Sequence, residues 1–132
     1  EAECRLGNDA GAREYLMDLM SKRDASYSCA QKSGTSMGKL TSDYTGSLLE
    51  EIIIQRRIEL WGEFGRIYDI RRLKQGFKRT AEMGWPTDAL LVNRNANDPE
   101  SYMWVLTIPQ TEFDGNSSLD QTKDQNPVGD TK

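Results

Sequence analysis

The sequence predicts a mainly α-helical protein with one short strand. Two stretches of the chain predict helices, and a third predicts the strand. Residues 52–72 are dense in apolar and charged side chains that recur at helical spacing. Residues 1–24 have the pattern of two helices joined by a tight turn. Residues 102–108 (YMWVLTI) are strand-like, because they combine β-branched and aromatic side chains and are followed by a proline. We therefore expect a helical hairpin, a central helix, irregular loops and a short C-terminal strand.

The central helix is expected to be covered from two sides. Its apolar side chains form two neighbouring stripes, whereas a surface helix needs only one. Ser47 and Glu50 have the spacing of a capping box at its start. The first stripe consists of Leu49, Ile53, Leu60 and Phe64, and the second consists of Ile54, Ile58 and Trp61.

A bend is expected at the end of the central helix. Gly62 and Gly65 bracket it, because glycine tolerates backbone angles that other residues avoid. Residues 66–74 then continue as a shorter helix, which Gly76 can end.

The charges of the same stretch alternate in sign at helical spacing. A neighbouring arginine lowers the pKa of a carboxylate, whereas a general acid needs a raised pKa. We therefore expect a structural ladder of ion pairs and no catalytic residue. Its members are Arg56, Glu59, Glu63, Arg66, Asp69 and Arg72.

The N-terminal hairpin is bounded by turn and cap residues. Gly7 can end the first helix in a left-handed conformation, and Asp9 is expected to cap the second. An antiparallel pair of this kind is the unit of a tetratricopeptide-like (TPR-like) repeat. From these residues alone, an ordinary helical hairpin is the better interpretation. The apolar residues of the second helix are Tyr15, Leu16, Leu19 and Met20.

The other segments lack helical periodicity. Residues 26–46 are rich in Ser, Gly, Thr and Lys, which is typical of a connecting loop. Within residues 77–101, the sequence Gly84-Trp85-Pro86 predicts a turn that carries an aromatic side chain. Residues 110–132 contain few apolar side chains, so we expect an extended surface tail.

Composition argues against several kinds of chemistry. The 132 residues contain no histidine, which removes histidine-dependent triads and most zinc sites. Cys4 and Cys29 are expected to be free structural thiols, because the hairpin places them apart. Asp98 and Glu100 stand among asparagines, but their spacing fits no known calcium loop, so a solvated turn is favoured. We expect no metal site and no cofactor.

The charge distribution does not favour nucleic-acid binding. The net charge is −4, although residues 56–80 carry eight bases and three acids. Carboxylates stand at helical spacing from several of these arginines, which favours internal pairing. Hydrophobic residues make up only 36% of the chain, and it begins EAECRLGN, so we expect a piece of a longer protein.

Two separated motifs resemble the SusD/RagB family, the outer-membrane nutrient-binding lipoproteins of the Bacteroidetes. Gln55 departs from the first motif, where Glu is usual, and the family's closing Gly-Tyr is replaced after Pro127. The matching positions of the first motif are Ile53, Arg56, Arg57, Glu59, Leu60, Glu63, Arg66, Asp69 and Arg72. Those of the second are Ile108, Pro109, Glu112, Asn116, Leu119, Gln125, Asn126 and Pro127.

The resemblance implies that residues 1–132 are the C-terminal part of a SusD-like domain, a portion of an α/α superhelix. Its expected parts are the last TPR-like helix pair (1–25), a loop (26–46), the central signature helices (47–76), a loop and strand (77–109) and an extended tail (110–132).

The resemblance also implies a binding function without catalysis. SusD-like lipoproteins lie on the external face of the outer membrane, held by an N-terminal lipid that would fall outside these residues. They bind oligosaccharides, or peptides in RagB-like members, for uptake through a SusC-like TonB-dependent transporter. The alternative is a helical-repeat module that binds a protein partner and no nutrient. A hydrolase is the third hypothesis, which turnover of a glycan would reveal.

Three tryptophans are candidates for contact with a sugar, because a flat ring can stack on the apolar face of a pyranose. Trp61 lies on the central helix and Trp104 in the expected strand, so both are expected in the core. Trp85 lies in a polar turn and is expected to be exposed. Trp85 is therefore the single residue that we predict to bind ligand.

Overall fold

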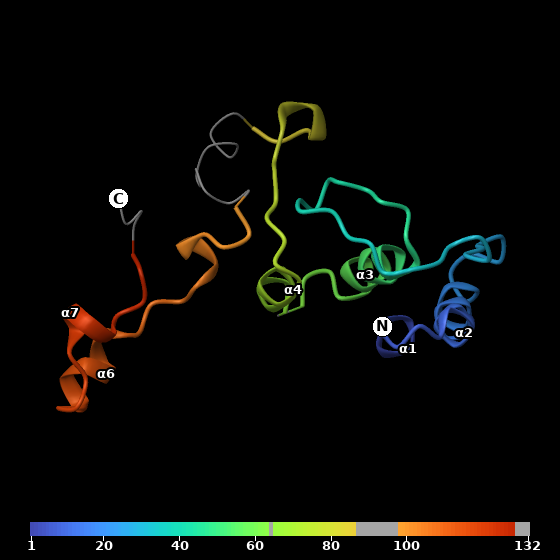
Figure 1. Ribbon diagram of the computed structural model, residues 1–132. Helices are drawn as coiled ribbons and strands as arrows, with labels where there is room; N and C mark the ends of the chain where they lie inside the picture. Colours follow the sequence, from blue (N-terminus) through green and yellow to red (C-terminus); the bar gives the residue numbers. More distant parts are fainter. Residues whose placement is uncertain (64, 87–97, 129–132) are drawn as a thin grey trace. The chain divides into compact units, whose positions relative to one another are not determined.

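The structure, a computed structural model, describes residues 1–63, 65–86 and 98–128. These residues form α-helices and short 3-10 helices, with no β-strand among them (Figure 1). The mainly helical fold is therefore confirmed. The chain divides into two compact units, Glu1–Arg66 and Ile67–Lys132.

Two short helices, α1 (Ala2–Arg5) and α2 (Asp9–Met20), open the first unit and are joined by a tight turn (Figure 1). Gly7 in this turn has a φ of +83°, the left-handed conformation predicted for it. Both helices contact α3 (Leu48–Glu59) as well as one another. The pair of helices is confirmed, and its kinship with a TPR-like repeat stays a prediction.

Buried apolar side chains come from all three helices and from the loop that follows α2. Helix α2 contributes every fourth residue, so one face of the helix is buried. Both cysteines are buried and free, as predicted. The buried apolar residues of this unit are Cys4, Ala12, Leu16, Met20, Cys29, Leu48, Leu49 and Ile53.

The cap of α2 differs from the prediction by one residue. Asn8 is the N-cap, because its side-chain oxygen accepts a hydrogen bond from the Gly11 N–H at 3.1 Å. The Asp9 carboxylate points elsewhere and accepts a hydrogen bond from the Gly34 N–H at 2.9 Å. Asp9 therefore ties the long loop to the start of α2.

The loop of residues 26–46 is held against the helices at further points. The Arg13 guanidinium of α2 donates to the carbonyl of Lys32 at 2.9 Å. The Leu48 N–H at the start of α3 donates to the carbonyl of Ser33 at 3.2 Å. A loop that satisfies helix donors in this way belongs to the fold of the first unit.

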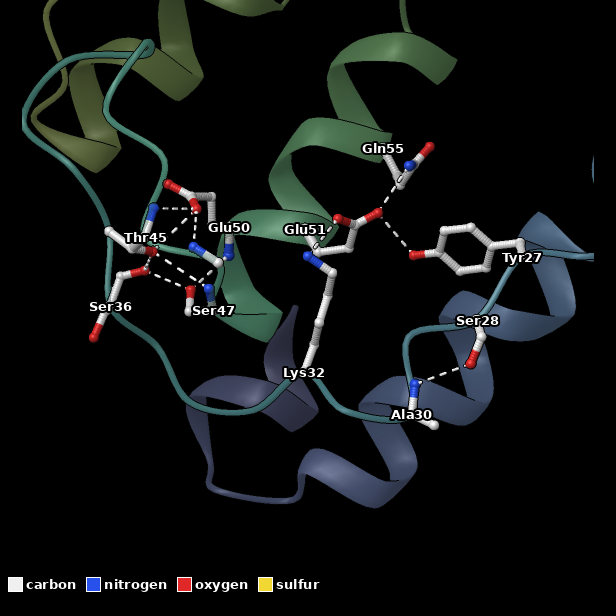
Figure 2. Close-up of polar contacts among 11 residues, drawn as sticks. Tyr27, Ser28, Ala30, Lys32, Ser36, Thr45, Ser47, Glu50, Glu51 and Gln55 are labelled. Atoms are coloured by element: carbon white, nitrogen blue, oxygen red, sulfur yellow. Dashed lines mark hydrogen bonds and ion pairs between the residues drawn. The ribbon is translucent and has the colours of Figure 1, made fainter.

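Half of the predicted capping box is present at the start of α3 (Figure 2), because the Ser47 N–H donates to the Thr45 hydroxyl and not to Glu50. The Ser47 hydroxyl oxygen accepts from the Glu50 N–H at 3.1 Å, as a capping box requires. The buried Glu50 carboxylate accepts from the N–H groups of Thr45 and Gly46, at 2.6 and 2.7 Å. The hydroxyls of Thr45 and Ser47 both donate to the carbonyl of Ser36. One carboxylate and two hydroxyls thus fix the end of the loop to the helix.

A second polar cluster joins the beginning of the loop to the next residue of α3 (Figure 2). The Glu51 carboxylate accepts from the Tyr27 hydroxyl at 2.8 Å and from the Gln55 amide at 2.9 Å. The Lys32 ammonium lies 3.1 Å from the other carboxylate oxygen. Burial, and then the hydrogen bond to Glu51, raise the pKa of Tyr27. Sequence analysis missed this cluster, since 24 positions separate Tyr27 from Glu51.

The second apolar stripe of the central helix is only partly covered, since Ile54 is half-buried, and the prediction for Trp61 is wrong. The first stripe packs inward through Leu49 and Ile53. On the second stripe, Ile58 is 56% exposed and Trp61 is 86% exposed. Phe64 lies outside the described residues. Helical spacing shows which side chains share a face, but it does not show that a partner covers that face.

The predicted bend after the central helix is confirmed. Gly62 and Gly65 have φ values of +80° and +157°, which favour glycine. The chain then forms α4 (Arg66–Leu73). This helix ends earlier than predicted, because Lys74 and not Gly76 adopts the left-handed conformation, with a φ of +48°.

The second unit has a small apolar cluster and several short helices. Buried Ile70 and Trp104 form the cluster, with Ile67 and Phe77 packed against them. The tail is not wholly extended, contrary to the prediction, because Pro109 and Asp120 are N-caps within it. The helices that follow α4 are η1 (Ala81–Met83), η2 (Tyr102–Trp104), α6 (Gln110–Gly115) and α7 (Gln121–Asp124).

The strand predicted for residues 102–108 is absent, and side chains explain the difference. Its first three residues form η2, closed by a hydrogen bond from the Val105 N–H to the Tyr102 carbonyl at 2.9 Å. The following residues find side-chain amides where a strand would find a neighbouring backbone. Gln125 bonds to Ile108, and the Asn126 amide donates to the Leu106 carbonyl at 2.7 Å.

Candidate functional site

The turn predicted at Trp85 presents this side chain to solvent, as expected. The 3-10 helix η1 ends at Gly84, whose φ of +79° lies in the left-handed region that favours glycine. The Gly84 N–H donates to the Ala81 carbonyl at 2.9 Å, and the Trp85 N–H donates to the Thr80 carbonyl at 3.4 Å. Trp85 leaves this turn with 42% of its surface exposed.

Arg79 lies against the same indole. Its guanidinium carbon is 4.3 Å from the centroid of the Trp85 ring and 4.9 Å from the centroid of the Phe77 ring. A guanidinium over an aromatic face is held by a cation–π interaction. Arg79 therefore links the exposed Trp85 to the half-buried Phe77.

Phe77 continues this series of contacts into the core of the second unit. Its ring meets Trp104 edge to face, with centroids 5.3 Å apart and an interplanar angle of 61°. Trp104 is 8% exposed, as predicted, and its indole N–H donates to the Asp98 carbonyl at 3.0 Å. The exposed indole of Trp85 is thus supported by a series of side-chain contacts that ends at the buried Trp104.

The three residues Phe77, Arg79 and Trp85 are hereafter the Trp85 platform. The platform offers a flat apolar surface beside a permanently charged, planar hydrogen-bond donor. Sequence analysis found Trp85 from its turn but missed Arg79, because the spacing from Phe77 to Trp85 follows no helix or strand period.

Two of the three carboxylates in the predicted ladder, Glu59 and Asp69, form ion pairs, but only the pair of Asp69 is one that the sequence predicted. Asp69 is buried and pairs with Arg72 at 2.8 Å, three positions along α4. Glu59 pairs with Arg23, which follows α2 in the first unit. Sequence analysis missed Arg23 as a partner, because it lies far from Glu59 along the chain.

The turn near Asp98 uses its carboxylates internally. Asp98 accepts a hydrogen bond from the Glu100 N–H at 2.9 Å, and Glu100 pairs with Lys74 at 3.5 Å. The asparagines that precede Asp98 lie outside the described residues. Across the described ranges, no three acidic or cysteine side chains are grouped to hold a metal ion.

Comparison with known proteins identifies the family of the chain. The model of the SusD family matches residues 1–127. The chain therefore belongs to the SusD family, whose members bind glycans and other nutrients at the cell surface, in association with the outer membrane. The family is one of binding proteins and not of enzymes. No curated protein and no solved structure matches the chain.

The helices of the described residues are short in comparison with a membrane-spanning helix. A helix that crosses the apolar core of a bilayer needs about 20 residues with few charges. Among the described residues, no helix is long and apolar enough to do so.

Proposed function

We propose that this chain helps to capture glycans at the external face of the outer membrane, and that Trp85 is a contact surface for the sugar. The captured glycan passes to a SusC-like TonB-dependent transporter, as the family resemblance implies. Peptides, the ligands of RagB-like members, are the other nutrient class that this proposal includes.

The observation that carries the proposal is the supported exposure of Trp85. A tryptophan that is 42% exposed on a surface loop would lose rotamer freedom on binding. Here the Gly84 turn fixes the backbone, and Arg79 already packs on the ring. A platform ordered in advance stacks on a sugar ring with less entropic cost.

The test is a titration of the full chain with oligosaccharides, followed by the NMR signals of the three indole N–H groups. We expect maltoheptaose, xylohexaose or oligogalacturonate to shift the Trp85 signal and leave the buried Trp104 signal in place. Trp85→Ala should weaken binding by about tenfold, as expected for loss of a stacked aromatic contact.

Trp61→Ala is the matched control, because Trp61 is a more exposed indole that lies outside the platform. If Trp61→Ala and Trp85→Ala weaken binding equally, the platform is not the site. If no glycan or peptide shifts any indole signal, the nutrient-binding proposal is wrong for this chain, and the protein-interaction alternative takes its place.

A further inference from the structure

The platform carries a charge that a neutral sugar does not need. Arg79 is ionised at any physiological pH, and its contacts are the two aromatic rings. Within the described part of the chain, no carboxylate lies within ion-pair distance of Arg79. Among the described residues, no ion pair neutralises its charge, and the two rings hold it in a defined place.

The contact of Arg79 with the two rings determines which ligand groups its guanidinium can bind. The guanidinium carbon of Arg79 lies over the Trp85 and Phe77 rings, and the five N–H groups of a guanidinium lie in its own plane. Those N–H groups match the paired oxygens of a carboxylate or a sulfate ester, which a guanidinium binds with two parallel hydrogen bonds. The same side chain thus buttresses Trp85 and offers an anion site at its edge.

The surrounding sequence favours an anion as well. Residues 71–79 contain five bases and no acid. Two of the five are neutralised, because Arg72 pairs with Asp69 and Lys74 pairs with Glu100. Glu82 on η1 stands three positions before Trp85 and is exposed to solvent, and Asp88, three positions after Trp85, lies outside the described residues. Lys78 is exposed beside Arg79, so the two adjacent residues 78 and 79 place two positive charges at the platform.

We propose that the Trp85 platform selects anionic glycans, those whose sugars carry a carboxylate or a sulfate group. This inference rests on the proposed function and specifies its ligand class. The pyranose stacks on Trp85, and the acidic substituent binds the in-plane N–H groups of Arg79. A neutral glycan uses the indole alone and leaves the Arg79 charge without a partner.

The test compares three oligosaccharides of similar length with the full chain at low and moderate salt. Maltoheptaose is the neutral probe, oligogalacturonate carries carboxylates, and a chondroitin sulfate oligosaccharide adds sulfate. We expect the anionic probes to bind about tenfold more tightly than the neutral probe, with affinity that falls as salt rises. Stronger binding of oligogalacturonate than of chondroitin sulfate would identify a carboxylate site, and the reverse order a sulfate site.

Two substitutions separate a specific site from a general positive charge. Arg79→Lys keeps the charge and loses the planar fork, and it should abolish most of the anionic preference. Lys78→Ala removes one neighbouring charge and should lower anionic affinity only slightly. Equal losses in Arg79→Lys and Lys78→Ala would show general attraction of polyanions and overturn the inference.

The outcomes for the two proposals remain distinct. If neutral and anionic glycans bind equally well through Trp85, the function stands and the selectivity is wrong. If no oligosaccharide binds, the proposed function itself fails. If anionic glycans bind but Arg79→Lys retains the full preference for them, another residue binds the acidic group of the glycan. The assignment to Arg79 is then overturned.

Discussion

The side-chain amide of Gln125 pairs with the backbone of Ile108 in the way that a neighbouring strand would. Its oxygen accepts from the Ile108 N–H at 2.8 Å, and its nitrogen donates to the Ile108 carbonyl at 2.9 Å. Asn126 adds a third hydrogen bond, to the Leu106 carbonyl. These contacts close the tail of the second unit over a segment whose backbone would otherwise find no partner.

Replacing Gln125 by Ala should loosen this closure. The variant loses both part-buried hydrogen bonds to Ile108, each with a net value of about 1 kcal/mol, and a third from the Asn126 N–H. Amide hydrogen exchange at Ile108 should therefore accelerate by about tenfold. Gln121→Ala is the matched control, because that amide bonds to the exposed side chain of Gln110 and not to backbone. Unchanged exchange at Ile108 would mean that the Gln125 pair is not formed in solution.

Ser47→Ala should destabilise the first unit by about 1 kcal/mol, the usual cost of removing an N-cap. The substitution removes the acceptor for the Glu50 N–H and one donor to the Ser36 carbonyl. Thermal unfolding followed by circular dichroism measures the effect. Ser28→Ala serves as the comparison, since the exposed Ser28 hydroxyl accepts one weak hydrogen bond in the loop, at 3.4 Å. Equal melting temperatures for the two variants would contradict the capping role.

Glu51 should make the first unit less stable in acid. Burial alone would raise its pKa, but hydrogen bonds from Gln55, Tyr27 and Lys32 and the Lys32 charge together hold the pKa below its ordinary value. A lowered pKa in the folded state gives stability that is complete above the unfolded-state pKa, near 4.5. That stability is lost as pH falls through the lower, folded-state pKa.

The measurement compares urea unfolding of the wild-type chain and Glu51→Gln from pH 7 to pH 3. The wild-type chain should lose more stability than the variant over the acidic part of this range, since glutamine does not titrate. The difference between the two curves isolates Glu51 from the other carboxylates. Parallel curves would show that Glu51 contributes no pH dependence.

Local signals in the sequence predicted most of the helical framework. Ser47 and Glu50 marked the start of α3, and Gly62 and Gly65 marked the bend after it, because caps and left-handed turns depend on residues close together in the chain. Trp85 was placed correctly for the same reason. The signal was local because the Gly84 turn directs the backbone at Trp85, although the contact with Arg79 was not predicted.

Contacts between residues that lie far apart in the sequence could not be predicted from local signals. Tyr27 and Glu51, Arg23 and Glu59, and Gln125 and Ile108 are pairs that the folded backbone brings together. The strand predicted for residues 102–108 is absent because of one such contact, that of Gln125 with Ile108. β-Branched and aromatic residues favour extended structure, but a strand also requires a neighbouring strand, and here side-chain amides take that place.

The exposure of Trp61 leads to a prediction that contrasts with Trp104. Trp61 is 86% exposed, so Trp61→Ala should change the free energy of unfolding by less than about 0.5 kcal/mol. Trp104 is 8% exposed, packs against Ile70 and Phe77, and donates a hydrogen bond to the Asp98 carbonyl. Trp104→Ala should therefore destabilise the second unit by about 3–5 kcal/mol. Urea unfolding followed by far-ultraviolet circular dichroism compares the two variants on the same chain. A large loss in Trp61→Ala would show that the second stripe of the central helix is covered in solution, which the sequence predicts and the structure contradicts.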